Sequence, residues 1–297
     1  MSLLREILSP DFLLRNSVYV SLLIGFACPV IGVFLVLRRM IFLGVALPQI
    51  SSTGVALALS LHVWYGHYDG AHGSGEKMLA FIGSIVFSVV AILWLAFLER
   101  RGRGMTEGRI GTAYVLALAA SILLLAKCAQ AERGWLELFK GQIIAIAKSD
   151  LHLALVTFAL VLLVLLVFRK EFLLVSFDPE MALTLRKNVL FWDVLLYLLI
   201  GVTISVAVLT AGPLITFGFM LIPPLIAHLF AQNMRQFAIA ASGIGGAAAF
   251  AGFCLAYQYD LPIGPTDVVL LGVVYALAFG VRKLLNLRAA KAELKTA

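Results

Sequence analysis

Nine apolar runs, each long enough to cross a bilayer as a helix, follow one another along this 297-residue chain. A membrane-spanning helix needs about 20 apolar residues, and only helices and closed barrels satisfy their backbone hydrogen bonds in lipid. The short alternating segments of barrel strands are absent. We therefore predict an all-α polytopic membrane protein with a single transmembrane domain over residues 1–297. The nine predicted spans are 17–37, 41–63, 78–98, 110–128, 150–168, 189–210, 213–231, 236–257 and 265–281.

The composition leaves almost no room for a soluble domain. The chain is 62% hydrophobic and 13% charged, whereas soluble domains are about 45–50% apolar and about 25% charged. The net charge of +7 does not indicate a nucleic-acid partner, because basic residues of polytopic proteins gather in cytoplasmic loops. The bilayer is the expected environment, and no nucleic acid is expected.

The distribution of basic residues predicts the orientation of the chain. With nine spans, one set of connections carries 16 of the 23 lysines and arginines and the other set carries 7. The richer set is expected in the cytoplasm, which places the C-terminus inside and the N-terminus outside. This assignment requires two spans separated at Ala211-Gly212-Pro213, because merging them would remove the charge bias downstream.

One cytoplasmic connection contains a short predicted helix, SFDPEMALTL (176–185). Asp178 is a suitable N-cap, Pro179 suits the first helical position, and Glu180 suits the positive end of the helix dipole. Such a capped helix on the cytoplasmic side is predicted to dock a soluble partner.

Polar residues interrupt the second apolar run at GVALPQISS (44–52). Val45 and Gln49 are four apart and share a helix face, and Pro48 removes one helical hydrogen bond. One interpretation is a broken helix that lines a polar pathway, with Ser52 beside it, because irregular backbone at membrane depth is tolerated there. The other interpretation is close helix–helix contact through small and hydroxyl residues, and this is favoured for the serines and threonine alone.

The run at 211–230 contains a second set of unusual residues. Gly212-Pro213 and Pro223-Pro224 are predicted to break a smooth span, and His228 lies one turn from its cytoplasmic end. His228 is a candidate gate or ligand, although packing at the interface is the favoured interpretation. Asp193 and Asp267 lie near predicted helix starts, where the helix dipole accounts for a carboxylate.

No soluble catalytic motif is present. The chain lacks a P-loop, an HExxH pair and a GxSxG elbow, so it is not expected to bind ATP itself or to be an enzyme. An external loop, 62–77, holds His62, His67 and His72 with Asp69. Their spacing fits no defined metal geometry, which favours a solvated loop over weak external capture of metal.

Six blocks, in order and spacing, resemble the membrane permease of zinc, manganese and iron ABC importers, the ABC-3 family. The most specific block contains SFDPEMA; the six are GVFLVLRRMIFLGVAL (32–47), EGRIGTAYVLALAASILLL (107–125), ELFKGQIIAI (137–146), RKEFLLVSFDPEMA (169–182), GPLITFGFMLIPPLIAHL (212–229) and YDLPIGPTDVVL (259–270). The resemblance implies a fold like that of the vitamin B12 importer and a homodimer in a bacterial inner membrane. It also implies an external or periplasmic substrate-binding protein and cytoplasmic ATPase subunits that carry ATP and Mg, with no cofactor in this chain.

The residue patterns and the resemblance together give two groups of candidate site residues. The coupling helix corresponds to Ser176–Leu185 and includes Ser176, Phe177, Asp178, Pro179, Glu180, Met181 and Ala182. The translocation path would include Val45, Pro48, Gln49, Ser52, Pro223 and His228.

Two departures from the family pattern affect these expectations. The family usually has an Asp and a His where this chain has Val45 and Gln49. Valine cannot bind a metal, and an amide oxygen suits hard cations rather than Zn²⁺. A metal chelate or another small solute is therefore an alternative substrate. Arg186-Lys187 stands where the family often has glycine after the coupling helix.

Two other classes of protein fit the sequence less well. An intramembrane enzyme would need ionisable residues facing one another at depth, and the span interiors contain almost none. A structural membrane protein without a pathway is disfavoured by the prolines at Pro48 and Pro223-Pro224. A permease subunit driven by a separate ATPase is the leading hypothesis.

Overall fold

The structure is a computed structural model that describes residues 14–64, 74–100, 106–126, 146 and 148–296. Within these residues the chain is helical, with turns and no strand, which confirms the predicted all-α class. The helices are α2 (Arg15–Leu37), α3 (Ile41–Trp64), α4 (Ser74–Arg100), α5 (Thr106–Ala126), α7 (Lys148–Val167), α8 (Arg169–Phe177), α9 (Pro179–Thr184), α10 (Val189–Ala211), α11 (Pro213–Phe230), α12 (Met234–Tyr259) and α13 (Ile263–Thr296).

Every predicted span falls on one of these helices. In the described chain eight helices are long and apolar enough to cross a membrane, and α4 adds a shorter apolar stretch, Met78–Trp94. The helices differ greatly in burial. Buried residues make up 72% of the apolar stretches of α3 and α10 but only 6% of that of α13. The helix with the candidate pathway residues, α3, is thus a central helix of the bundle.

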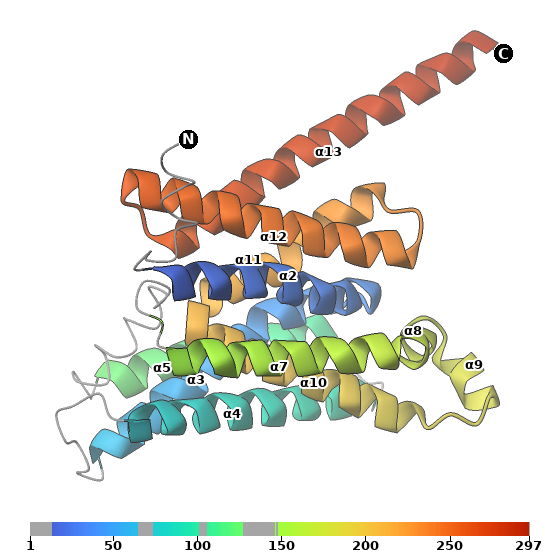
Figure 1. Cartoon of the computed structure of the whole chain (residues 1–297). Helices are drawn as coiled ribbons and strands as arrows, with labels where there is room; N and C mark the ends of the chain where they lie inside the picture. Colours follow the sequence, from blue (N-terminus) through green and yellow to red (C-terminus); the bar gives the residue numbers. More distant parts are fainter. Residues whose placement is uncertain (1–13, 65–73, 101–105, 127–145, 147, 297) are drawn as a thin grey trace.

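Figure 1 shows α2 lying between α12 and α7, with α8 and α9 at one end of the bundle. The connection from α11 to α12 lies at the same end, and α13 leaves the bundle in that direction. We call this end the α9 end. Helix α2 packs against both α7 and α12, and α3 packs against α4, α5, α10 and α11.

Small residues allow the helices to approach closely. A Cβ atom added at Gly54 on α3 would meet the backbone carbonyl of Gly83 on α4, and one added at Gly83 would meet that of Gly54. Such contacts between backbones are typical of helices that pack inside membranes. They hold α3 and α4 together along the face that carries Ser51.

The prolines behave differently from what the sequence predicts. The predicted division at Gly212 is confirmed, because α10 ends at Ala211 and Gly212 has a φ of 85°. The predicted breaks at Pro48 and at Pro223-Pro224 are wrong, since α3 and α11 continue through them. In α11, Pro224 cannot donate to the carbonyl of Met220, and Gly32 of α2 packs directly against that carbonyl. The neighbouring helix thus accommodates the proline.

The last helix is longer than predicted. The apolar run ends at 281, but α13 continues to Thr296. The segment after the apolar run is rich in Leu, Ala, Lys and Arg, which are strong helix formers. Helix propensity therefore extends α13 beyond the part that is apolar enough to lie in a membrane.

Candidate functional site

Helix α9 begins as the sequence predicts. Asp178 is its N-cap, and its Oδ1 accepts a hydrogen bond from the backbone N–H of Met181 at 2.8 Å. Pro179 occupies the first turn, together with Glu180. The predicted boundary of 176–185 is too early, because Ser176 and Phe177 form the last turn of α8. Asp178 has an extended ψ of 83°, as expected before a proline, and this residue separates the two helices.

Helix α9 ends in a Schellman motif. The N–H of Arg186 bonds the carbonyl of Leu183 at 2.9 Å, and the N–H of Lys187 bonds the carbonyl of Ala182 at 3.0 Å. Arg186 has a φ of 55°, in the left-handed region where glycine is usual. The departure at Arg186-Lys187 therefore places a strained arginine at a position where the family pattern has glycine, and the turn itself is retained.

Helix α9 has one buried contact and an apolar outer surface. Ala182 is fully buried and anchors α9 against the bundle. The exposed apolar side chains are Phe177 (60% exposed), Met181 (52%), Leu183 (62%) and Leu185 (54%). We call residues 177–185 the α9 knob. Clustered exposed apolar side chains on a connection mark a surface for a partner.

Arg38 ties both ends of the α9 knob to the bundle. Its Nη1 lies 2.8 Å from Oδ1 of Asp193 on α10. Its Nε donates a hydrogen bond of 3.1 Å to Oγ of Ser176 at the end of α8. Its guanidinium also lies 5.3 Å from the centre of the Tyr197 ring, within the range of a cation–π contact. These four residues form the Arg38 cluster.

The Arg38 cluster also touches α3. Arg38 lies in the short turn between α2 and α3, where Met40 N–H bonds the carbonyl of Leu35 at 3.0 Å. Tyr197 donates its hydroxyl to Sδ of Met40 at 3.4 Å. A single arginine therefore contacts the segments before and after α9 and lies three residues from the start of α3. Sequence patterns miss this cluster because its members are far apart along the chain.

An aromatic group supports the Arg38 cluster. The ring of Trp192 on α10 lies 5.3 Å from Phe168 and 5.5 Å from Phe172, measured between ring centres. Phe172 in turn packs edge-on against Phe34 of α2 at 6.2 Å. Aromatic pairs at these distances add to the energy of burial, so α8 is held firmly to α2 and α10.

The two intramembrane aspartates do not owe their positions to the helix dipole. Asp193 and Asp267 are each the fifth residue of their helices, beyond the first turn where the dipole acts. Asp193 is paired with Arg38. Asp267 is fully buried, its carboxylate lies against Gly252 of α12, and neither oxygen has a hydrogen-bond partner among the described residues.

The polar residues of α3 bond to neighbouring helices. Gln49 is 6% exposed, and its Nε2 donates to Oγ of Ser121 on α5 at 3.4 Å. Oγ of Ser51 lies 2.6 Å from Oγ of Ser84 on α4. The hydroxyl of Thr53 lies 2.9 Å from the carbonyl oxygens of Gln49 and of Ala117 on α5. The interpretation of the hydroxyls as helix–helix contacts is confirmed for Ser51 and Thr53.

The other candidate pathway residues lie at different depths. Val45 is half-buried, and Pro48, Ser52 and Pro223 are buried. Helices α3 and α11, which carry these four positions, pack against each other. His228 is separate from them in its environment. It is exposed at the end of α11, and its ring packs 5.5 Å from that of Phe237 on α12, as expected for interfacial packing.

The described residues contain no group of three or more His, Cys, Asp or Glu side chains that could hold a metal ion. The histidine-loop residues His67, Asp69 and His72 lie outside the described part of the chain, and only His62 is placed. The side-chain hydrogen bond described for Gln49 joins it to the hydroxyl of Ser121 and not to a carboxylate or an imidazole. In the described residues, the hydrogen bonds of Gln49 and Ser51 thus involve amide and hydroxyl groups.

Comparison with known proteins extends the resemblance to nearly the whole chain. Residues 11–282 match the ABC 3 transport family. The chain is 25% identical over 266 residues to the manganese import system permease protein ScaB of Streptococcus gordonii, covering 90% of both chains. It is 26% identical over 266 residues to the manganese transport system membrane protein MntC of Listeria innocua, covering 90% and 89%. It is 25% identical over 279 residues to a probable iron transport system membrane protein of Haemophilus influenzae, covering 94% and 93%.

Two solved structures share the fold. PsaBC from Streptococcus pneumoniae in complex with Fab superposes with a TM-score of 0.77 at 22% identity and covers 94% of both chains. An inward-facing transporter of metal-chelate type superposes with a TM-score of 0.68 at 18% identity, covering 91% of this chain and 85% of that one. The family match over most of the length and the shared helical fold lead to one conclusion: the chain belongs to the ABC 3 transport family, and is the membrane-spanning permease subunit of an ABC importer whose ATPase is a separate subunit.

Proposed function

We propose that the α9 knob is the coupling element of this permease, on which the ATPase subunit docks. The observation that carries this proposal is the apolar outer surface of the α9 knob, formed by Phe177, Met181, Leu183 and Leu185. The cap at Asp178 and the Arg38 cluster hold this surface in a fixed orientation. Motion of the ATPase would then reach α10 and the turn before α3 through Arg38. ATP and Mg would bind only the ATPase.

The same proposal orients the chain in a bacterial inner membrane. The connections rich in basic residues include the turn between α2 and α3 at Arg38-Arg39. They also include the segment of α8 and α9, which has Arg169-Lys170 at its start and Arg186-Lys187 after its end. The positive-inside rule places such connections in the cytoplasm. The α9 end and the C-terminus would then face the cytoplasmic ATPase. The opposite end would receive substrate from an external or periplasmic binding protein.

We propose that the permease works as a homodimer. Helix α5 covers Gln49 inside one subunit, but its outer face exposes large apolar residues, with Leu116 and Leu123 70% and 69% exposed. A second copy placed against this face would bury these apolar side chains between the two subunits. The path residues would be Val45, Pro48, Gln49, Ser52 and Pro223, with His228 near the cytoplasmic exit.

The proposed substrate is a divalent transition metal, with manganese and iron favoured over zinc. The relatives described above are named for manganese and iron transport. A specific observation supports a metal chelate as the second candidate. Val45 and Gln49 supply no carboxylate or imidazole, and Gln49 is already bonded to Ser121. A chelate keeps its own ligands and needs fewer from the protein, whereas a bare Mn²⁺ prefers carboxylate and similar oxygen ligands.

Uptake by cells tests both parts of this proposal. A strain that lacks the gene would be complemented with the parent chain or with Met181→Asp, which places a charge in the α9 knob. Radioactive Mn²⁺, Fe²⁺ and Zn²⁺ would be supplied with and without an excess of a small chelator. We expect energy-dependent uptake of Mn²⁺ or Fe²⁺ by the parent and little uptake by the variant. Uptake that requires the chelator would identify the chelate as substrate, and equal uptake by parent and variant would refute the role of the knob.

A further inference from the structure

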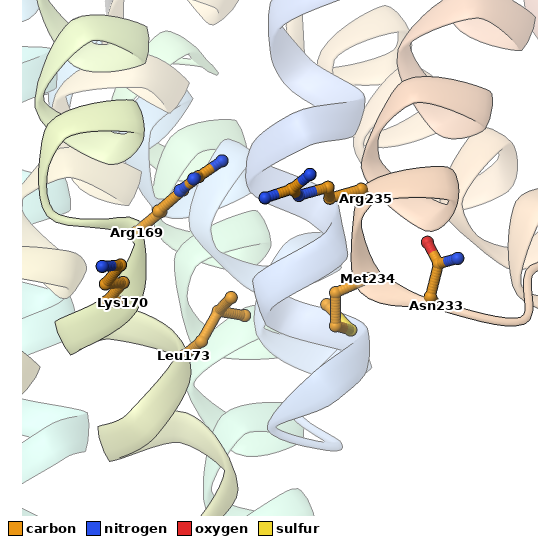
Figure 2. A pocket seen from close by; sticks show the side chains of 6 residues that line it. All are labelled: Arg169, Lys170, Leu173, Asn233, Met234 and Arg235. Carbon is orange, nitrogen blue, oxygen red and sulfur yellow. The ribbon is translucent and has the colours of Figure 1, made fainter.

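A pocket with mostly apolar walls and three basic residues in its lining lies at the α9 end, apart from the α9 knob and from α3. Its volume is about 400 Å³, and it is lined by Arg169, Lys170 and Leu173 of α8, by Met234 and Arg235 of α12, and by Asn233 before α12. Figure 2 shows the guanidinium groups of Arg169 and Arg235 extending toward one another across the space between α8 and α12. No acidic side chain lines the pocket.

The charges of this pocket are uncompensated within the described chain. At the same end, Arg38 is paired with Asp193, and Lys187 lies 3.9 Å from Glu171. Arg169, Lys170 and Arg235 form no ion pair with any described residue. Two cations facing one another repel unless an anion lies between them. The first N–H groups of α12 add positive potential beside Arg235, because a helix N-terminus attracts anions.

The surroundings of the pocket distinguish a lipid from a soluble anion. Arg169 lies two residues after the span of α7, and Arg235 is the second residue of the span of α12. The ends of membrane spans lie near the depth of lipid headgroups. The inner wall is apolar. Met234 packs, as do Val36 and Leu37 of α2, against a buried cluster that includes Val33 and Phe237. Leu173 lies on the opposite side of the pocket (Figure 2).

The helices beside the pocket also carry exposed apolar side chains farther along the membrane-spanning part. Helix α2 lies between α7 and α12 (Figure 1). Its Phe26 is 46% exposed and lies against Gly246 of α12. Leu166 at the end of α7 and Ile239 in α12 are 66% and 73% exposed. Acyl chains lying along these side chains would place a phosphate at the two guanidinium groups.

We propose that this pocket binds the phosphate headgroup of an anionic phospholipid from the leaflet on the α9 side. Arg169 and Arg235 hold the phosphate from two sides, Lys170 adds charge, and Leu173 and Met234 contact the upper acyl carbons. Basic pockets between membrane helices bind anionic headgroups in this way. The lipid bridges α8, which leads into the α9 knob, to α12.

Native mass spectrometry of the purified chain in detergent tests this proposal. Phosphatidylglycerol and phosphatidylcholine with identical acyl chains would be titrated against the parent, Arg169→Gln with Arg235→Gln, and a control, Arg282→Gln with Lys283→Gln. The control removes the same charge from exposed positions of α13. We expect the parent to prefer phosphatidylglycerol and the pocket variant to bind it about 30-fold more weakly, because each cation near a headgroup contributes roughly fivefold. The control should retain the preference, as should Arg169→Lys with Arg235→Lys.

Several results would overturn the proposal. Equal loss in the control would show a general charge effect, and equal binding of phosphatidylcholine would show that no headgroup is recognised. Displacement of the lipid by millimolar inorganic phosphate would identify a site for a free anion. If the pocket variant keeps its lipid preference but loses co-purifying ATPase, the pocket is a protein contact. The lysine variant, purified as a single species, separates loss of the pocket charge from misfolding.

Discussion

Replacing Arg38 by methionine should loosen the α8–α9 segment while the bundle remains folded. Methionine keeps much of the apolar stem of arginine but removes its charge and its donors. The Arg38 and Asp193 side chains are only 10% and 18% exposed, so the carboxylate of Asp193 would lose its ion pair with Arg38 in a mostly buried place. The substitution also removes the donor to Ser176.

The size of this effect follows from the two lost interactions. A hydrogen bond to a charged group such as Asp193 contributes about 1.5–3 kcal/mol to stability. A hydrogen bond to a neutral acceptor such as Ser176 contributes about 0.5–1.5 kcal/mol more. The local free energy of opening of α8–α9 should therefore fall by about 2–4 kcal/mol. A change of about 2 kcal/mol corresponds to roughly 30-fold faster exchange of the protected amides.

Hydrogen exchange measured by mass spectrometry provides the assay. Peptides covering 172–187 should exchange faster in Arg38→Met, whereas peptides from α11 should not change. Arg39→Met is the matched control, because Arg39 is the adjacent arginine and is exposed. In a double-mutant cycle, Asp193→Asn combined with Arg38→Met should cost less than the sum of the two single changes, by about 1–2 kcal/mol.

Transport measurements complete this test. In the assembled importer, Arg38→Met should reduce uptake more than ATP hydrolysis, because the ATPase would still turn over on a loosely held knob. Unchanged exchange in 172–187, or an equal change in Arg39→Met, would refute the assignment of Arg38 as the residue that ties α9 to the bundle. Additive effects of Arg38→Met and Asp193→Asn would show that their ion pair contributes nothing.

Four further predictions follow from the site. Asp178→Ala should weaken α9 by about 1 kcal/mol and reduce co-purification of the ATPase, with Asp178→Asn as a control that keeps a cap; equal behaviour of the two variants would refute this. Arg186→Gly should stabilise the end of α9 by up to about 1 kcal/mol, measured as slower amide exchange there. Val45→Asp with Gln49→His should create a metal site, so Mn²⁺ or Zn²⁺ should raise the melting temperature of this variant and not of the parent. The purified chain alone should show no ATPase activity above background, and clear turnover would contradict this.

The α9 knob shows how much of the site can be predicted from sequence. Asp178, Pro179 and Glu180 act within one helical turn, so their spacing alone predicts the cap. The predicted start at Ser176 is wrong because the preceding α8 continues to Phe177, and the two helices are separated by a single residue. Apolar periodicity does not resolve a boundary this short.

The Arg38 cluster and the bonds of Gln49 were not predicted because they depend on distant residues. Arg38 and Ser176 are separated by 138 positions, and Gln49 and Ser121 by 72. Local spacing carries no information about such pairs. The available signal was chemical, because an arginine and an aspartate near the ends of two apolar helices each need a partner. That signal identifies Arg38 and Asp193 as candidates without showing that they meet.

The prolines of α11 show why a helix break cannot be predicted from the sequence of one helix alone. The missing N–H of Pro224 leaves the carbonyl of Met220 without a helical donor, which predicts a break if α11 is considered alone. Gly32 lies against that carbonyl, where any side chain would force α2 away, and an α-carbon hydrogen can then point at the oxygen. Whether a proline breaks a membrane helix is therefore decided by the residue on the neighbouring helix. Gly32→Ala should separate α2 from α11 and lower the thermal stability of the chain. Gly243→Ala is the control, because a Cβ at Gly243 meets nothing within 4 Å, and it should have a smaller effect. Equal stability of the two variants would show that the contact at Met220 is dispensable.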